Sequence, residues 1–296
     1  TAWIWRLSEL PDSLPASVDD LDETTAIAFQ HVLEQASIII APTQFSATAP
    51  LKLAAKTSGF RAATMPGFSP DMLPALRLDY VEINRRVDFL KTLLDQASSA
   101  HIEFCVDNDA RYSLVLDLRH RSAHASGGLI HSPGSAGNLP SGEAYIVPYE
   151  GEIPNTPSLS RGILPVQFPD GLVLYHVEQN TVRTVTGSPS PALEREQAHL
   201  DREPAYGNIA ELGLGVLAAF GVQPCNEILL DEKLGLHIAF GRSDHFGGRV
   251  GTAQFSSPDA VIHIDRVFVK SIQPRISICR LTLSITETTD IDLMRN

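Results

Sequence analysis

The chain has 296 residues, 43% hydrophobic and 20% charged, which is enough for about two globular domains of ~150 residues each. Lysine and arginine total 23 against 35 aspartate and glutamate, and the resulting net charge of −12 repels nucleic acid and anionic membrane surfaces. No apolar run reaches the roughly 20 residues that span a bilayer, and the largely apolar stretch 212–226 is broken by glycines and a proline. We therefore expect neither a nucleic-acid nor a membrane partner.

In chain order, the first third alternates helical and strand patterns. The predicted helices span 24–35, 51–58 and 79–98, and the predicted strands span 37–41, 61–65 and 101–106. Pro50 and Gly59 mark the start and the end of the second helix. Strands that alternate with helices of this kind predict an open α/β layer.

After Asp107 the helical spacing gives way to short alternating stretches separated by glycine, proline, serine and asparagine. The predicted strands span 112–118, 143–147, 171–177, 236–240 and 260–270, and the predicted helices span 191–200 and 209–220. Residues 122–142, rich in serine, glycine and histidine, predict a long mobile loop. The sequence thus predicts an α/β protein with an N-terminal open α/β domain (1–108) and a C-terminal β-rich α+β domain (109–296).

The three cysteines bear on the cellular compartment. Cys105, Cys225 and Cys279 lie far apart, next to apolar residues and in no metal-ligand spacing. Such cysteines are typical of buried thiols in a reducing compartment. The first residues show no basic region followed by an apolar stretch, so we expect no secretory signal here, although processing could have removed one. These observations predict a cytoplasmic protein.

Several familiar catalytic signatures are absent from the sequence. It lacks the phosphate-binding glycine loop, the paired-glycine dinucleotide fingerprint, the His-Glu-x-x-His zinc helix and the serine elbow. The remaining candidates are carboxylates and histidines beside glycine or proline, all in the β-rich half.

The clearest of these motifs is Val-Ile-His-Ile-Asp at 261–265. Successive side chains of a strand point to opposite faces, so His263 and Asp265 project together. A neutral imidazole and a carboxylate on one rigid strand can share a divalent cation such as zinc, manganese, cobalt or iron(II). The alternative is an exposed polar strand face, which is the commoner meaning of an isolated His-x-Asp pattern.

A second motif places His237 inside an otherwise apolar strand. A buried imidazole needs a partner, which can be a metal ion or a hydrogen-bonded backbone group. Glu232 precedes it in a charged turn, where it could serve as a general base or remain a solvated carboxylate.

Two further carboxylates complete the set. Glu143 begins the strand 143–147, and Glu211 falls in the first turn of the predicted helix 209–220, where the helix dipole alone favours an acidic residue. Each motif is weak by itself. Together they supply the ligand types of a two-metal hydrolytic site, in which carboxylates bridge the ions and a shared water ionises near neutral pH.

Six short motifs in this order resemble one known family, the thermophilic aminopeptidases called aminopeptidase T and aminopeptidase S, which are dinuclear metallopeptidases. The motifs are Asn138–Glu143, Ile209–Gly215, Asp231–Lys233, His237–Gly241, Phe246–Gly248 and His263–Asp265. The resemblance implies two divalent ions (zinc, cobalt or manganese), a metal site in the second domain, and a homodimer. The residues it implies are the metal ligands Glu143, Glu211, His237, His263 and Asp265, and the catalytic base Glu232.

The sequence departs from the family pattern in several ways: it is shorter, and the turn usual before the second domain is altered at 110–114. Leu236 replaces the threonine that usually precedes the ligand histidine, and Asp244–His245 stands where the peptidases have a tyrosine. The scaffold also resembles 2,5-dihydroxypyridine 5,6-dioxygenase, a ring-cleaving enzyme with one iron(II). In that case His237, His263 and Asp265 would form a two-histidine, one-carboxylate iron site.

Three functions follow from these motifs. The first is an aminopeptidase that acts on short peptides or small molecules, and the second is the iron(II) dioxygenase. The third is a binding or structural protein built on a former enzyme scaffold, in which the ligand residues no longer bind metal.

Overall fold

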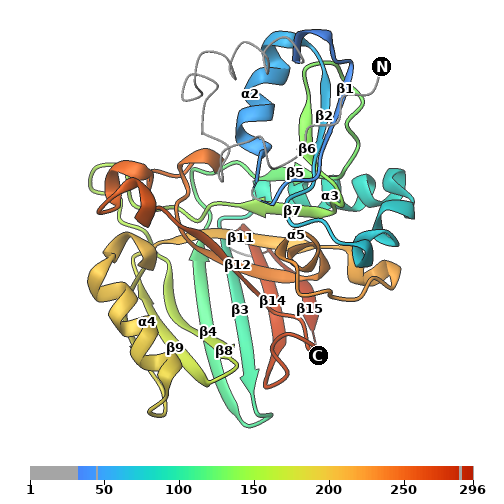
Figure 1. Cartoon of the computed structure of the whole chain (residues 1–296). Coiled ribbons are helices and arrows are strands. Elements are labelled where there is room, and N and C mark those ends of the chain that lie inside the picture. The colour runs from blue at the N-terminus through green and yellow to red at the C-terminus, as the bar shows by residue number, and fades with distance from the viewer. Residues whose placement is uncertain (1–32, 45, 287–288, 296) are drawn as a thin grey trace.

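The computed structural model describes residues 33–44, 46–286 and 289–295 (Figure 1). The α-helices are α2 (Thr48–Ser58), α3 (Tyr80–Gln96), α4 (Pro191–Arg202) and α5 (Ile228–Asp231). The first strands are β1 (Ile38–Ala41), β2 (Arg61–Thr64), β3 (Ser99–Val106), β4 (Ala110–Asp117), β5 (His124–Ser126), β6 (Ala136–Asn138), β7 (Glu143–Ile146) and β8 (Arg161–Phe168). The others are β9 (Gly171–Glu178), β10 (Thr181–Thr186), β11 (Ile209–Gly215), β12 (Leu236–Gly241), β13 (His263–Val267), β14 (Ile276–Thr286) and β15 (Thr289–Arg295).

The strands form three sheets, and the mixture of helices and sheets confirms the predicted α/β fold class. A parallel three-stranded sheet, β1-β2-β6, and α2 form the upper layer of Figure 1. A five-stranded sheet, β13-β12-β11-β7-β5, crosses the middle, and a seven-stranded sheet, β10-β9-β8-β4-β3-β14-β15, forms the lower half.

Local sequence signals explain several helix ends. Asp79 caps α3, because its side chain accepts hydrogen bonds from two backbone N–H groups of the first turn. Ser190 caps α4 in the same way, with Pro191 in the first helical position. Gly59 ends α2 in the left-handed conformation that favours glycine, as its position in the sequence predicts.

The five-stranded and seven-stranded sheets enclose one hydrophobic core. Ile238 and Phe240 of β12 are fully buried in it together with Leu116 of β4. Phe240 also contacts Tyr175 of β9, with ring centroids 5.0 Å apart. The alternation of side chains along β12 leaves His237 and Ala239 on the opposite face of the five-stranded sheet.

The predicted helix over 209–220 is wrong, because residues 209–215 form strand β11 and only Leu217–Phe220 forms a short 3-10 helix. β11 lies between β12 and β7 and is buried along nearly its whole length, so its apolar residues show no clear alternation. Two glycines make the close packing possible. A Cβ at Gly213 would lie 1.9 Å from His237 Nε2, and one at Gly215 would lie 2.1 Å from the Lys233 carbonyl carbon.

Three other predictions need correction or fall outside the described residues. The predicted loop 122–142 contains β5 and β6, which pair into two different sheets. The predicted strand 260–270 is strand only over His263–Val267. Of the predicted helix 24–35, only the helical residues 33–35 are described.

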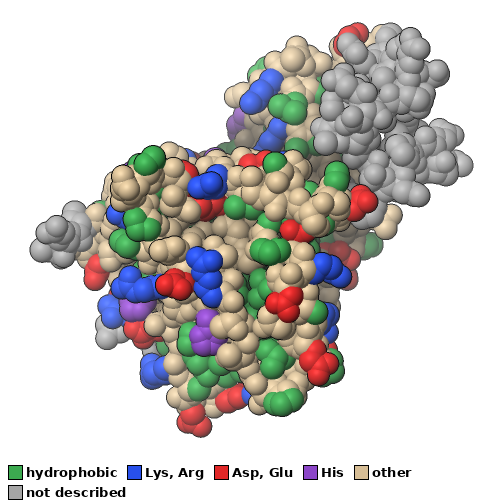
Figure 2. Space-filling view, turned by 90° about the vertical axis from the view of Figure 1, so that its left-hand side faces the viewer, with side chains coloured by type: hydrophobic (Ala, Val, Ile, Leu, Met, Phe, Trp, Pro, Cys, Tyr) green, Lys and Arg blue, Asp and Glu red, His purple; other side chains and the backbone are tan. Residues whose placement is uncertain are grey.

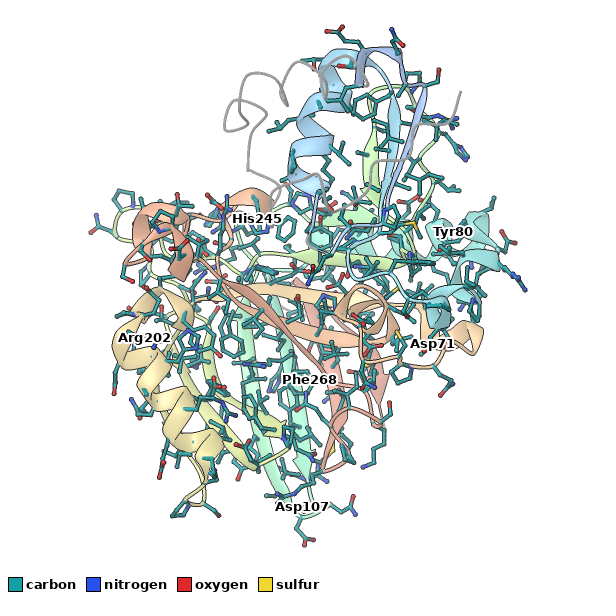
Figure 3. All side chains as sticks on the ribbon, in the orientation of Figure 1. Asp71, Tyr80, Asp107, Arg202, His245 and Phe268 are labelled. Atoms are coloured by element: carbon teal, nitrogen blue, oxygen red, sulfur yellow. A yellow bond between two sulfur atoms is a disulfide. The ribbon has the colours of Figure 1, made fainter. Side chains whose placement is uncertain are left out.

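The predicted domain boundary near residue 108 falls in the turn between β3 and β4. These strands pair along their full length in the seven-stranded sheet, and Asp107 lies at the end of the molecule opposite α2 (Figure 3). This sheet therefore contains residues from both sides of the boundary, and the division into domains stays a prediction.

The prediction of three buried thiols is wrong, because Cys105 and Cys279 form a disulfide. The two residues lie 174 positions apart in the sequence but on the paired strands β3 and β14. Their Cα atoms are 5.9 Å apart, within the range of about 4.4–6.8 Å usual for disulfides. The cysteine pattern therefore gives the predicted cytoplasmic location no support. Only Cys225 is a free thiol.

The surface is of mixed charge on the face that Figure 2 displays. Acidic, basic and hydrophobic side chains are interspersed there, so the negative net charge is not gathered into one patch on that face. Within the described part of the chain, no helix is long and apolar enough to cross a membrane.

Candidate metal site

One face of the five-stranded sheet collects the five predicted metal ligands. Paired positions in an antiparallel sheet share a face. The pairs that define this face are Gly241 with His263, Ala239 with Asp265, Glu211 with Ala239, Gly213 with His237, and Gly215 with Glu143. Side chains from four neighbouring strands therefore converge above small residues that leave room for them.

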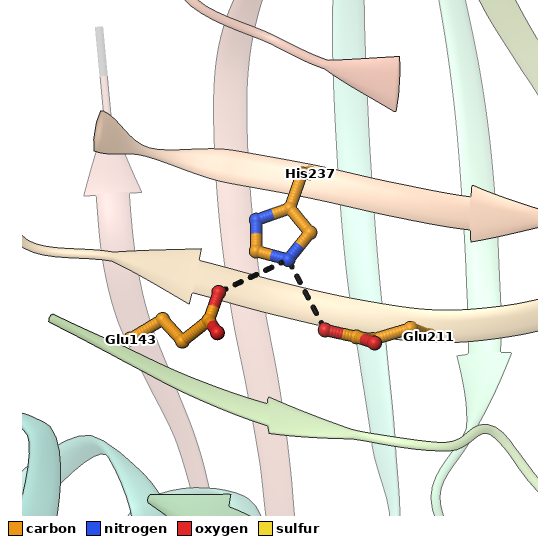
Figure 4. Close-up of side chains that lie close together, drawn as sticks. All are labelled: Glu143, Glu211 and His237. Carbon is orange, nitrogen blue, oxygen red and sulfur yellow. Dashed lines mark hydrogen bonds and ion pairs between the residues drawn. The ribbon is translucent and has the colours of Figure 1, made fainter. Parts of the chain in front are cut away.

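The first group of ligand atoms joins three strands. His237 Nε2 lies 3.2 Å from Glu211 Oε1 and 3.5 Å from Glu143 Oε2 (Figure 4). All three residues are buried, and His237 is fully enclosed. Their ligand atoms lie within 4.8 Å of one another, which is close enough for one cation to reach all three.

The second group uses the other oxygen of Glu211. His263 Nε2 lies 3.4 Å from Glu211 Oε2 and 3.7 Å from Asp265 Oδ1. These three residues also have ligand atoms within 4.8 Å of one another. Glu211 is thus common to both groups. The set His237, His263 and Asp265 expected for a single iron is not one of the two groups found among the described residues.

The backbone fixes the orientation of the His263 ring. Its Nδ1 lies 2.7 Å from the carbonyl oxygen of Arg242, a distance at which Nδ1–H donates a hydrogen bond. Nε2 then faces Glu211 and Asp265. A metal-binding histidine commonly has its second nitrogen held by a carbonyl in this way.

Glu232 lies at the start of a 3-10 helix, Glu232–Leu234, which precedes β12. Lys233 in the same turn is fully buried, and its Nζ donates to Glu143 Oε1 at 2.6 Å and also to Glu232. The sequence analysis missed Lys233 as a site residue. The sequence carried only a local hint, since Lys233 directly follows Asp231 and Glu232, and its burial beside Glu143 could not be seen before the fold was known.

The pKa values of the site carboxylates are shifted in opposite directions: that of Glu232 is raised, and those of Glu211 and Asp265 are lowered. Burial raises the pKa of Glu232 to about 8, and the charges of Glu143 and Asp265 add to this effect despite the opposing Lys233. Burial also acts to raise the pKa of Glu211, but hydrogen bonds from His237 and His263 outweigh it and hold that pKa below its usual range. The pKa of Asp265 is likewise lowered, because burial would raise it but the interaction with His263 has the larger effect.

The pKa values of the two imidazoles, His237 and His263, are both raised. Burial disfavours their charged forms, but the neighbouring carboxylates dominate. The pKa of His237 is raised to about 9 by Glu211, Glu143 and Asp265, and the pKa of His263 is raised well above its usual value by Asp265 and Glu211. Without metal, protons on these rings partly balance the carboxylates.

The residues of this site fit divalent metal ions. Three carboxylates and two imidazoles supply oxygen and nitrogen ligands, the types that zinc, cobalt, manganese and iron(II) accept. Glu143 Oε2 is buried and has no hydrogen-bond partner within the described ranges. A buried carboxylate oxygen in that position is costly unless a cation satisfies it.

Aromatic and imidazole rings border the site beside His263. A second 3-10 helix, Asp244–Phe246, brings the rings of His245 and Phe246 within 5.2 Å and 5.6 Å of the His263 ring. Phe246 also contacts Tyr145, and Tyr145 stacks on His124 at 5.1 Å. His245 lies at the level where the upper layer meets the five-stranded sheet (Figure 3).

The structure thus brings all six predicted site residues close together. The four carboxylates and two histidines interact through ion pairs, hydrogen bonds or direct electrostatic effects on one another's pKa values. Glu211 reaches the site from a strand and not from a helix, which removes the helix-dipole explanation for that residue.

The sequence matches no known family profile and no curated protein. Solved structures with a similar fold include two enzymes. A 2,5-dihydroxypyridine dioxygenase from Pseudomonas putida KT2440 is 19% identical, with a TM-score of 0.60 over 82% of this chain and 69% of that one. Wild-type AmpT, an aminopeptidase T from Thermus thermophilus, is 14% identical, with a TM-score of 0.61 over 98% of this chain and 82% of that one. At these identities the likeness shows a shared fold alone.

Proposed function

We propose that this protein is a metal-dependent hydrolase, most specifically an aminopeptidase that releases N-terminal amino acids from short peptides. Two divalent cations, zinc, cobalt or manganese, would be held by the five side chains that converge on the sheet face. Those residues are Glu143, Glu211, His237, His263 and Asp265.

The observation that carries this proposal is the position of Glu211. Its Oε1 faces His237 and its Oε2 faces His263, so one carboxylate joins two ligand groups. A single metal ion would need only one of these two ligand groups, whereas a pair of ions is commonly bridged by a carboxylate. When bound, the two cations would supply Lewis-acid chemistry and make a bound water more acidic.

Glu232 is the proposed proton-transfer group. A general base works best when its pKa lies near the operating pH, and the pKa of Glu232 is about 8. In a hydrolase it would accept the proton of the attacking water and return it to the leaving amine. Lys233 contacts both Glu232 and Glu143, and so holds the base beside the ligand set.

The proposal is tested by assaying protein purified without chelators. We expect hydrolysis of an aminoacyl p-nitroanilide and none of its N-acetyl derivative, because an aminopeptidase needs the free amine. Glu232→Gln should lower kcat by about 100-fold or more while the metal content stays unchanged. Full activity of Glu232→Gln would exclude the assigned role, and absence of hydrolysis by metal-loaded wild type would exclude the aminopeptidase.

A second candidate is an iron(II) ring-cleaving dioxygenase. The rings of His245 and Phe246 beside His263 favour it, because they would suit a planar aromatic substrate. The dioxygenase with a similar fold acts, by its name, on such a compound. One bound iron and oxygen uptake with 2,5-dihydroxypyridine would establish this candidate and exclude the hydrolase.

A further inference from the structure

Glu150 is a buried acidic residue outside the predicted site. It lies shortly after β7, and its side chain is only 3% exposed. A buried carboxylate needs several donors to offset its lost hydration. Glu150 has four donors, which come from three different segments of the chain.

The two oxygens of Glu150 divide these donors evenly. Oε1 accepts hydrogen bonds from Ser243 Oγ at 2.5 Å and from Asn208 Nδ2 at 2.7 Å. Oε2 accepts from the backbone N–H of Arg249 at 2.5 Å and lies 3.5 Å from Nη2 of Arg121. Two of the four donors, those of Ser243 and Arg249, belong to the segment 242–250, which carries the rings of His245 and Phe246.

The same segment closes tightly upon itself around Ser243, which is fully buried. The backbone N–H of Ser243 donates to the Val250 carbonyl at 2.8 Å, and the Val250 N–H donates to Ser243 Oγ at 3.2 Å. Gly248 packs against this contact, since a Cβ there would lie 2.2 Å from Ser243 Oγ and 3.1 Å from Glu150 Oε1. Glu150 therefore anchors the segment at both of its ends.

Arg242 connects this anchor to the metal site. It precedes Ser243, and its carbonyl oxygen accepts the hydrogen bond from His263 Nδ1 at 2.7 Å. We infer that Glu150 is a positioning residue: by fixing the segment 242–250 it holds the Arg242 carbonyl against His263 Nδ1 and keeps Nε2 directed at Glu211 and Asp265. This inference concerns the site of the proposed function, but its first test below requires no metal.

Glu150→Gln is the informative variant. In one orientation the amide NH2 of glutamine would face two obligate donors, the Arg249 N–H and the Arg121 guanidinium. In the other it would face Asn208 Nδ2, also an obligate donor, beside the Ser243 hydroxyl, so at least one donor loses its acceptor either way. Glu152→Gln is the matched control, because Glu152 also pairs with Arg121 but makes no hydrogen bond or ion pair with residues 242–250 within the described structure. If Glu150→Gln does not fold, Ser243→Ala replaces it in the measurements. This variant removes the hydrogen bond from Ser243 Oγ to Glu150 and keeps the carboxylate.

The first measurement uses metal-free protein. Nitrogen-15 NMR should detect a slowly exchanging Nδ1 proton on His263 in wild type and Glu152→Gln. In Glu150→Gln this proton should exchange about 10-fold faster or more, together with the backbone N–H of Arg249. Equal exchange in wild type and Glu150→Gln would overturn the inference, whether or not the protein binds metal.

The second measurement separates this inference from the proposed function. Wild type should bind Co²⁺ with a visible absorption spectrum, and Glu150→Gln should bind it about 10-fold to 100-fold more weakly and with an altered spectrum. Unchanged affinity and spectrum in Glu150→Gln would overturn the positioning role. Failure of wild type to bind Co²⁺ would instead overturn the proposed metal site, and the exchange measurement would still decide the role of Glu150.

Discussion

Each oxygen of Glu211 faces a different imidazole, and this makes Glu211 the residue on which a two-metal site depends. His237 and His263 lie at 3.2 Å and 3.4 Å from its two oxygens. Its environment favours the ionised form even though the side chain is buried, since its pKa lies below the usual range. An ionised, buried carboxylate whose two oxygens face two different imidazoles is well suited to bridge two cations.

Glu211→Gln should therefore reduce the metal content by at least one ion per chain. The amide offers one acceptor oxygen where the carboxylate offers two, so it cannot bridge. Elemental analysis of the variant checks this, with Glu178→Gln, an exposed residue of β9, as the control. A variant that keeps the full wild-type metal content would show that Glu211 does not bridge.

The same residues predict how the metal-free protein responds to pH. The pKa of His237 is raised to about 9 and that of Glu232 to about 8, so both groups bind protons more tightly in the folded state than in the unfolded state. A raised histidine pKa stabilises below the unfolded value of about 6.5, and this stability is lost as the pH rises through about 9. Glu232 acts in the same direction, because from about pH 4.5 to about pH 8 its folded form keeps a proton that the unfolded chain has already released.

We therefore expect the Tm of chelator-treated protein to fall between about pH 6.5 and pH 9. Added Zn²⁺ should reverse the trend, because metal binds the deprotonated ligands and binds better as the pH rises. Thermal unfolding across this range checks both statements. A Tm of the metal-free protein that rises with pH would contradict the assigned shifts.

At the scale of elements, strand register determines which side chains meet. The spacing of His263 and Asp265 could be interpreted from the sequence, since alternation along a strand is a local property. The place of Glu211 could not, because β11 is buried on both faces and its Leu-Gly-Leu-Gly pattern has no amphipathic period. Glu150 and the pairing of Cys105 with Cys279 depend on contacts between distant segments, which no local pattern encodes.

Gly213→Ala tests the element packing directly. The added Cβ would lie 1.9 Å from His237 Nε2, so either the ring or strand β11 must move. We expect a loss of about 1–3 kcal/mol in the free energy of unfolding and weaker metal binding. Gly137→Ala is the control, because its Cβ would meet only ordinary contacts at 3.8 Å. Urea unfolding and Co²⁺ titration that show no difference between the two variants would contradict this packing.

At the scale of the whole molecule, the disulfide between Cys105 and Cys279 cross-links the neighbouring strands β3 and β14 of the seven-stranded sheet. The homodimer, the cytoplasmic location and the domain division remain predictions.

The negative net charge of −12 includes Glu143, Glu211, Glu232 and Asp265, whose repulsion bound cations would relieve. Metal should therefore stabilise the folded chain as any ligand of the native state does.

Removal of the disulfide should lower the stability substantially. A cross-link between residues 174 positions apart is worth about 4–5 kcal/mol when only the entropy of the unfolded chain is counted. The double variant Cys105→Ser with Cys279→Ser should thus unfold at clearly lower urea concentration, whereas Cys225→Ser should not. Three free thiols per chain in denatured, unreduced wild type would show that the disulfide does not form.

The metal content of wild-type protein purified without chelators tests the two-metal site most directly. Elemental analysis should find two ions of zinc, cobalt or manganese per chain, and His263→Ala should lose at least one of them. A single iron per chain, or a metal content that His263→Ala leaves unchanged, would contradict the two-metal site.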